Sequence, residues 1–191
     1  MAFESDSTVQ PTAVASEQPS ELDAAFGDEA AFRTWYEQCV PRVYAYLFHR
    51  CGRDAGLAEE LTQQAFVEVV RRRARFRGRS DAVTWVIGIA RNKLVDYYRR
   101  ADRDQRRLAA LGARDFGAQA DPGWQEAARD EIDEALGVIP PFQRAVLVLH
   151  YMDHLSVRDV SNLIGKSEVA TASLLARGRD AFRQAYQQVE K

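Results

Sequence analysis

The residues best suited to metal binding or catalysis are too few and too scattered to form a site. Cys39, His49 and Cys51 offer at most three ligands, at a spacing that matches no common zinc motif. His150 and His154 lie four residues apart, but the sequence supplies no third ligand near them. There is no Ser-His-Asp arrangement, glycine-rich phosphate loop or catalytic carboxylate pair. The sequence therefore predicts no catalytic residue, metal site, cofactor or small-molecule substrate, and the chain is expected not to be an enzyme.

The chemistry that the sequence does favour is the binding of a polyanion. The 191-residue chain has a net charge of only −2, but the charge is unevenly distributed. Residues 1–28 carry six acidic and no basic residues, residues 29–110 have a net charge of +7, and residues 111–191 have one of −3. A basic block inside a near-neutral protein is typical of a nucleic-acid-binding face, although a solvated arginine surface gives the same pattern.

Helical periodicity explains how the basic block is positioned. Residues 1–27 are rich in small and polar residues, so we expect a disordered acidic leader. From Asp28 to Arg50, apolar residues recur at three- and four-residue intervals, which predicts a helix that Pro41 should bend or split.

Two further helices are expected in the same domain. Asp54 is the predicted N-cap of the second, and Ser80 is the predicted N-cap of the third, which should run to about Arg100. No segment alternates with a period of two, so we expect no sheet. Residues 28–103 are therefore predicted to form a small all-α domain.

A second helical domain is expected after a flexible linker. The periodicity is lost over residues 104–123 and returns over residues 124–191. Ser156 should cap a short helix, Gly165 should form a turn, and Ser167 should cap a longer final helix. This order is typical of a DNA-binding helix-turn-helix, although any helical hairpin can have it.

The sequence also indicates where the chain works. Its longest uncharged apolar runs are far shorter than the roughly 20 residues that a bilayer span requires. The N-terminus carries acidic residues and lacks the basic start of a secretory signal. We expect a cytoplasmic protein without membrane insertion.

At this point two blocks of the sequence resemble a known family. Residues 58–100, which begin AEELTQQAFVEVV, look like region 2 of the bacterial RNA polymerase sigma factors of the extracytoplasmic-function (ECF) group. Residues 135–183 are similar to region 4 of the same group. The resemblance implies a factor that binds core RNA polymerase, directs it to specific promoters and begins to melt promoter DNA. It also implies an anti-sigma factor as a partner. The alternative is a stand-alone helix-turn-helix regulator with a helical partner-binding domain, which leaves the region 2 block unexplained.

The resemblance assigns one helix face to the clamp helices of the polymerase largest subunit. A helix that docks on a coiled coil needs apolar anchors flanked by polar side chains. Leu61 and Phe66 could instead be core residues, and for Phe66 the two roles are equally favoured. The assigned polymerase-binding residues are Glu60, Leu61, Gln63, Gln64, Phe66 and Val67.

The resemblance assigns the following segment to melting and reading of the minus-ten element. Melting costs base pairing and stacking. The protein offsets this free-energy cost by trapping a splayed base while arginines hold the phosphates. Asn92 aligns with a position that contacts the flipped base, whereas the apolar neighbours of Trp85 favour a core role for that residue. The assigned residues are Arg75, Phe76, Arg77, Arg79, Trp85, Arg91, Asn92, Lys93, Arg99 and Arg100.

The final helix departs from the family pattern for reading the minus-thirty-five element. The two basic residues that flank the equivalent of Ser173 in the family are Ala172 and Leu174 here. We therefore expect weak reading, with Leu174 either contacting a thymine methyl group or belonging to a partner-binding surface, and with Gly178 loosening the helix. The assigned residues are Lys166, Ser167, Glu168, Thr171, Ser173, Arg177 and Arg179.

Overall fold

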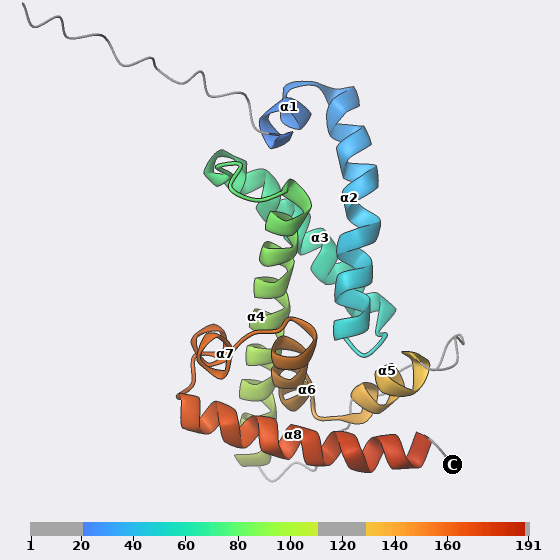
Figure 1. Ribbon diagram of the computed structural model, residues 1–191, viewed down its shortest axis with the longest axis vertical. Coiled ribbons are helices and arrows are strands. Elements are labelled where there is room, and N and C mark those ends of the chain that lie inside the picture. The colour runs from blue at the N-terminus through green and yellow to red at the C-terminus, as the bar shows by residue number, and fades with distance from the viewer. Residues whose placement is uncertain (1–20, 111–128, 190–191) are drawn as a thin grey trace, which may run out of the picture.

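The computed structural model describes residues 21–110 and 129–189, and every regular element in these ranges is helical (Figure 1). The all-α prediction is therefore confirmed. The elements are α1 (Glu21–Gly27), α2 (Glu29–Arg50), α3 (Ala55–Arg72), a 3₁₀ turn η1 (Arg73–Arg75), α4 (Ala82–Ala110), α5 (Arg129–Val138), α6 (Pro141–Leu147), a π-helical turn η2 (Val148–Met152), α7 (Val157–Ile164) and α8 (Glu168–Val189).

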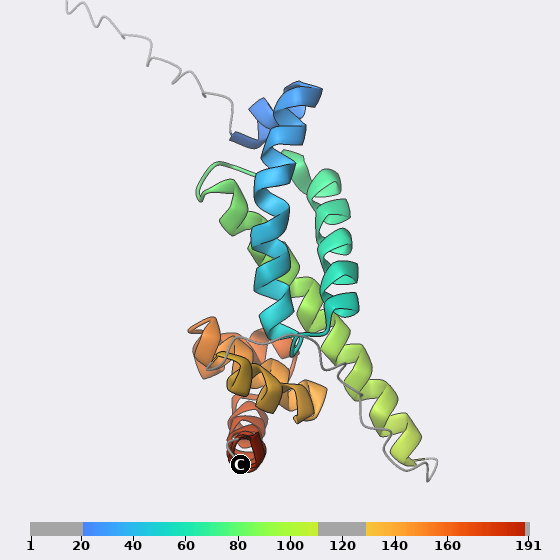
Figure 2. The ribbon, with the colours of Figure 1, turned by 90° about the vertical axis from the view of Figure 1, so that its right-hand side faces the viewer.

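The helices form two groups that share the long helix α4. Helices α2 and α3 pack on each other and on α4, and α1 packs on α2. Helices α5 to α8 form the second group, in which α8 packs on α5, α6 and α7. Figures 1 and 2 show α4 running from the first group down to the second, where it contacts α6 and α7. The buried apolar residues of both groups form one continuous cluster.

Helix α2 begins where the sequence predicted and continues through its proline. Asp28 caps it by accepting a hydrogen bond from the Ala31 backbone N–H at 2.9 Å. Pro41 lies inside the helix and does not split it, contrary to one of the two predicted outcomes. Cys39 and Val43 are completely buried on either side of Pro41, so both halves of the helix are held against the same core.

Helix α4 differs from the prediction at both ends. Asp81, not Ser80, provides its N-cap, accepting from the backbone N–H groups of Val83 and Thr84. The Thr84 hydroxyl group also donates to Asp81, and these hydrogen bonds lower the pKa of the carboxyl group below its usual range. The helix continues to Ala110, so residues 104–110 are helical and not part of a linker.

A short helix occupies the end of the predicted leader. Helix α1 buries Leu22, and the Phe26 ring lies 4.8 Å from that of Phe32 and 6.1 Å from that of Trp35, between centroids. The sequence prediction missed this helix because packing on α2 stabilises it. The leader residues 1–20 and the linker residues 111–123 lie outside the described ranges.

The helix-turn-helix has the predicted caps. Ser156 accepts from the Asp159 backbone N–H at 3.1 Å, and Ser167 accepts from that of Ala170 at 3.2 Å. Gly165 ends α7 with a φ angle of 66°, in the left-handed region that favours glycine.

Gly178 has a packing role that the sequence did not reveal. It is buried where α8 crosses α6, and a Cβ atom at this position would lie 3.1 Å from Cγ of Leu147. The missing side chain lets the two helices approach closely, so the expectation that Gly178 simply loosens α8 is incomplete.

Candidate functional site

The predicted polymerase-binding residues divide between the core and the surface of α3. Leu61 and Phe66 are buried, and the Phe66 ring packs against Trp35 and Tyr36, so neither residue is available as a surface anchor. Gln63 and Val67 are exposed. Gln64 is partly exposed and donates to the Glu60 carboxylate at 2.9 Å. The exposed Val70 extends the same face and was missed.

A shallow hollow of about 280 Å³ accompanies this face of α3. Glu68 lies in its wall, paired with Arg72 and, at 3.4 Å, with Lys93 of α4. These two partners, Arg72 first, lower the pKa of the Glu68 carboxyl group below its usual range. Lys93 was predicted to contact DNA, but the structure places it here. The hollow is lined by Glu60, Gln63, Gln64, Val67, Glu68, Arg71 and Lys93.

The loop before α4 exposes the predicted arginines but hides its aromatic residue. Arg75, Arg77 and Arg79 are exposed. Phe76 is only 8% exposed and packs 5.3 Å from Trp85, between ring centroids. The assignment of Phe76 to melting and reading of the minus-ten element is therefore wrong for this conformation, and the core role favoured for Trp85 fits its partial burial.

The predicted DNA-binding residues further along α4 point in different directions. Asn92 and Arg100 are exposed. Arg91 is half-buried, and its charge acts on Tyr46 of α2. Arg99 donates through Nε to the Ile164 carbonyl oxygen at 3.1 Å. Asn92 and Arg100 can therefore meet a nucleic acid without rearrangement, whereas Arg91 and Arg99 are only partly exposed.

The exposed face of α8 begins at its N-terminus. Glu168, Ser173 and Arg177 are exposed. Val169 is also on this face and is 78% exposed, but it was not among the predicted residues. Thr171 is completely buried and donates to the Ser167 carbonyl oxygen, so its assignment to base reading is wrong.

Leu174 is buried as well, and both proposals for an exposed role of this side chain are therefore wrong. An apolar side chain suits this position because this side of α8 faces the core of the second group.

The two remaining cations at this end have other neighbours. Lys166 lies 3.6 Å from the Asp102 carboxylate of α4, and its ammonium group lies over the Phe142 ring. Arg179 borders an apolar groove of about 610 Å³ between α5, η2 and α8, a feature that helical periodicity did not indicate. The groove is lined by Ile132, Leu136, Leu147, Val148, Tyr151, Met152, Arg179, Phe182, Arg183, Tyr186 and Gln187.

The potential metal ligands of the described residues do not cluster. No group of three or more His, Cys, Asp or Glu residues suited to a metal ion occurs within the described ranges. Cys39 and Cys51 are buried thiols, and burial raises the pKa of Cys51 to about 12. Over the same ranges, each helix is too short or too polar to cross a bilayer.

Comparisons with known proteins agree with this arrangement. Residues 35–104 match the family model for sigma-70 region 2, and residues 129–182 match that for sigma-70 region 4. The ECF RNA polymerase sigma factor SigK of Mycobacterium tuberculosis is 30% identical over 178 residues, covering 86% of this chain and 91% of that protein. SigX of Bacillus subtilis, also an ECF sigma factor, is 27% identical over 165 residues, covering 81% of this chain and 83% of that protein.

A solved structure shows the same fold. The sigma factor RpoE of Bartonella quintana, determined in complex with the anti-sigma factor NepR, aligns with a TM-score of 0.50 at 18% identity. The alignment covers 82% of this chain and 96% of that chain. With both sigma regions matched in order and relatives matched over nearly their whole length, the chain belongs to the ECF RNA polymerase sigma factors.

Proposed function

We propose that the chain binds core RNA polymerase, directs it to promoters through minus-ten and minus-thirty-five elements, and begins to melt the DNA at the minus-ten element. The observation that supports this most strongly is the presence of two separate reading faces. Exposed arginines and Asn92 belong to the first helix group, and a capped helix-turn-helix belongs to the second. A stand-alone helix-turn-helix regulator needs only the second face and leaves the exposed face of α3 unused.

The polymerase contact is proposed on the exposed part of α3. Glu60, Gln63, Gln64 and Val67 would meet the clamp helices, while the buried Leu61 and Phe66 hold α3 on the core. Exposed amides beside an apolar side chain suit a helix docked on a coiled coil.

DNA at the minus-ten element is proposed to meet the loop before α4 and the exposed side of α4. Arg75, Arg77, Arg79 and Arg100 would neutralise phosphates. Asn92 would hold the splayed base, because an amide offers both a donor and an acceptor to a base edge.

The minus-thirty-five element is proposed to meet the start of α8, through Ser167, Glu168, Ser173 and Arg177, with Lys166 available for a phosphate once it leaves Asp102. In this proposal residues 28–103 serve the polymerase and the minus-ten element, and residues 124–191 serve the minus-thirty-five element.

The proposal also covers partners and location. The chain would confer promoter specificity on polymerase without catalysing a reaction itself, and it would act in the cytoplasm, where promoter DNA is found. An anti-sigma factor is proposed as a further partner, by analogy with the RpoE structure solved with NepR.

Run-off transcription tests the proposed function. A bacterial core polymerase and the full chain are incubated with a library of randomised promoters, and transcribed templates are sequenced. We expect enrichment of templates with two conserved elements and copurification of the chain with core polymerase. Failure of both would overturn the proposal.

A further inference from the structure

The two helix groups meet at an interface that uses residues assigned to DNA. Arg99 of α4 hydrogen-bonds to the carbonyl oxygen of Ile164, at the turn of the helix-turn-helix. Lys166, just after that turn, pairs with Asp102 of α4 at 3.6 Å. Each of these two cations therefore contacts the opposite group in this conformation.

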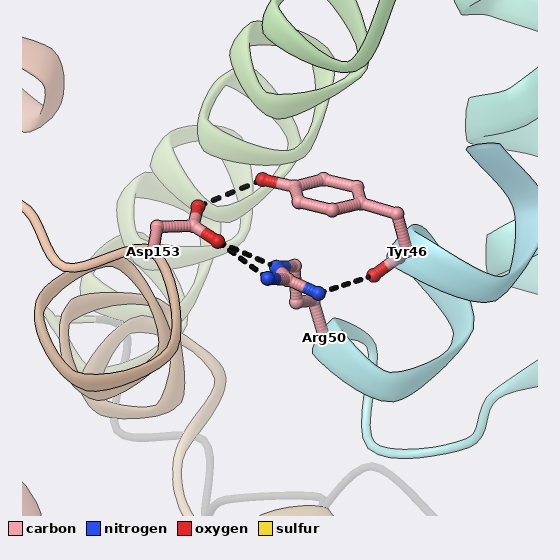
Figure 3. A network of polar contacts seen from close by, with 3 residues as sticks. All are labelled: Tyr46, Arg50 and Asp153. Carbon is pink, nitrogen blue, oxygen red and sulfur yellow. Dashed lines mark hydrogen bonds and ion pairs between the residues drawn. The ribbon is translucent and has the colours of Figure 1, made fainter. Parts of the chain in front are cut away.

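A partly buried polar cluster joins the two groups at the same interface (Figure 3). Asp153, which follows η2, accepts from the Tyr46 hydroxyl group at 2.7 Å and from Nε of Arg50 at 2.8 Å. The side chains of Asp153 and Arg50 are 5% and 13% exposed, and the Arg50 guanidinium lies 3.7 Å from the centre of the Tyr46 ring. We call Tyr46, Arg50 and Asp153 the latch.

The chemistry of the latch suits a specific contact. Burial, and next the neighbouring Asp153 charge, raise the pKa of Tyr46 above its ordinary value, so the phenol keeps its proton and donates. Removing one partner of a buried ion pair leaves an uncompensated charge, which is strongly unfavourable. The two latch residues on α2 thus select one placement of the second group.

A second buried cation joins the groups beside the latch. The Arg144 side chain of α6 donates to the carbonyl oxygen of Cys51 at 2.6 Å, and to those of Gly137 and Ile139. Cys51 is the C-cap of α2, whereas Gly137 lies in the last turn of α5 and Ile139 directly follows α5, so one guanidinium bridges both groups.

The closed arrangement is too compact for a promoter-bound sigma factor. Elements centred at minus ten and minus thirty-five are about 25 base pairs apart, or roughly 85 Å along B-DNA at 3.4 Å per base pair. Here a hydrogen bond of 3.1 Å joins the two reading regions, from Arg99 to Ile164. The 18 residues from 111 to 128 can span at most about 60–65 Å when extended. Their length therefore permits the two groups to move well apart.

We propose that the free chain inhibits itself: the latch holds the two groups closed, and it must open before both promoter elements can be bound. This inference rests on the proposed function and adds a step to it. A ligand or partner that binds only the open chain has its apparent affinity reduced by the fraction of chain that is closed. Core polymerase and promoter DNA would therefore have to overcome the latch.

The experiment opens the latch from each side separately. Asp153→Asn removes its charge in the second group, and Arg50→Gln removes its charge in the first. Asp180→Asn is the matched control, because Asp180 is an exposed carboxylate whose ion pair with Arg183 lies within α8. Circular dichroism checks the helical content of each variant, and small-angle X-ray scattering of the full chain measures the radius of gyration.

Both latch variants are expected to keep their helical content and to increase the radius of gyration by about 5 Å, as separated domains of this size should. At limiting chain concentration, with core polymerase and a promoter selected by the wild-type chain, they should form three- to tenfold more promoter complex. Asp180→Asn should match the wild type in both measurements.

Two results overturn the inference, and a third overturns the proposed function instead. If the radius of gyration of both variants stays that of the wild type, the latch does not hold the chain closed. If the chain expands but promoter complexes do not increase, the contact is not inhibitory. If wild-type and variant chains both fail to initiate with core polymerase, the proposed function itself fails, and the scattering result still shows whether the latch exists.

Discussion

At the scale of single residues, Asp81 and Ser80 are adjacent candidates for the cap of α4, and only the Asp81 side chain reaches the helix N–H groups. Asp81→Ala should lower the free energy of unfolding at pH 7 by about 1 kcal/mol, the usual value of a cap. Ser80→Ala should change it little. Urea unfolding of both variants measures the difference, and equal losses would contradict the assignment.

The pH dependence of this effect has a definite sign. The pKa of Asp81 is lowered in the folded chain, so its contribution is complete above the ordinary carboxyl pKa of about 4. It is lost as the pH falls through the lower, folded-state value. Repeating the unfolding at progressively lower pH should therefore shrink the difference between Asp81→Ala and the wild type.

Asn92 is exposed on the proposed melting face, and its loss should affect base capture alone. Asn92→Ala should reduce open-complex formation on duplex promoters more than on templates with a pre-opened bubble. Permanganate footprinting of unpaired thymines measures open-complex formation on both kinds of template.

Phe76→Ala provides the contrast, because it removes a buried ring and should destabilise the fold by about 3–5 kcal/mol. Its losses should be similar on both templates. An Asn92→Ala variant with the same pattern would reassign that residue to folding or polymerase contact.

At the scale of elements, two glycines within helices should respond in opposite ways to the same substitution. Gly88→Ala in α4 adds a methyl group that meets no neighbouring side chain within 4 Å, so helix propensity should raise the stability by up to about 1 kcal/mol. Gly178→Ala places its methyl group 3.1 Å from Cγ of Leu147, which should cancel or reverse that gain. Thermal unfolding measures the stability of both variants. An equal gain in stability would show that the contact between α8 and α6 can accommodate the extra methyl group.

Helix α8 offers a second pair of opposite outcomes. Ala172 is exposed on the reading face, so Ala172→Lys should add a phosphate contact and tighten binding of the full chain to a minus-thirty-five duplex. Leu174→Arg would bury a charge and should unfold the second group. Fluorescence anisotropy and circular dichroism measure the two effects. A wild-type chain that already binds tightly and selectively, with no gain from Ala172→Lys, would show that this helix is not a weakened reader.

Local signals explain what could be predicted from the sequence. The caps Asp54, Ser156 and Ser167 were found because a cap is defined by a polar residue next to a periodic segment. Helix α1 was missed because its stability comes from burying Leu22 and packing Phe26 on α2.

The candidate site shows the same limit. The family resemblance indicated which segments face polymerase and DNA, but side-chain burial depends on packing between distant elements. Phe76 is buried between two exposed residues, Thr171 is buried next to the exposed Ala172, and Arg99 donates to a carbonyl oxygen 65 residues away. Periodicity alone cannot distinguish these positions from the exposed ones beside them.

At the scale of the whole molecule, the two groups share one core and one bridging guanidinium, so the chain should unfold in a single transition. Arg144→Met leaves buried carbonyl groups without a donor, which should cost about 1–3 kcal/mol and separate the unfolding into two transitions. Arg33→Met, at an exposed pair with Glu29, should have almost no effect. Differential scanning calorimetry distinguishes these results, and an unchanged single transition in Arg144→Met would contradict the coupling.

The burial of Arg50 and Asp153 makes the balance between closed and DNA-bound chain sensitive to ionic strength. Contacts with phosphates weaken steeply as salt rises, because each one depends on the release of counterions from DNA. A buried ion pair is screened far less than exposed charges, and this pair is almost inaccessible to solvent. Rising salt should therefore weaken promoter binding while leaving the latch closed, so that high ionic strength would favour the closed chain.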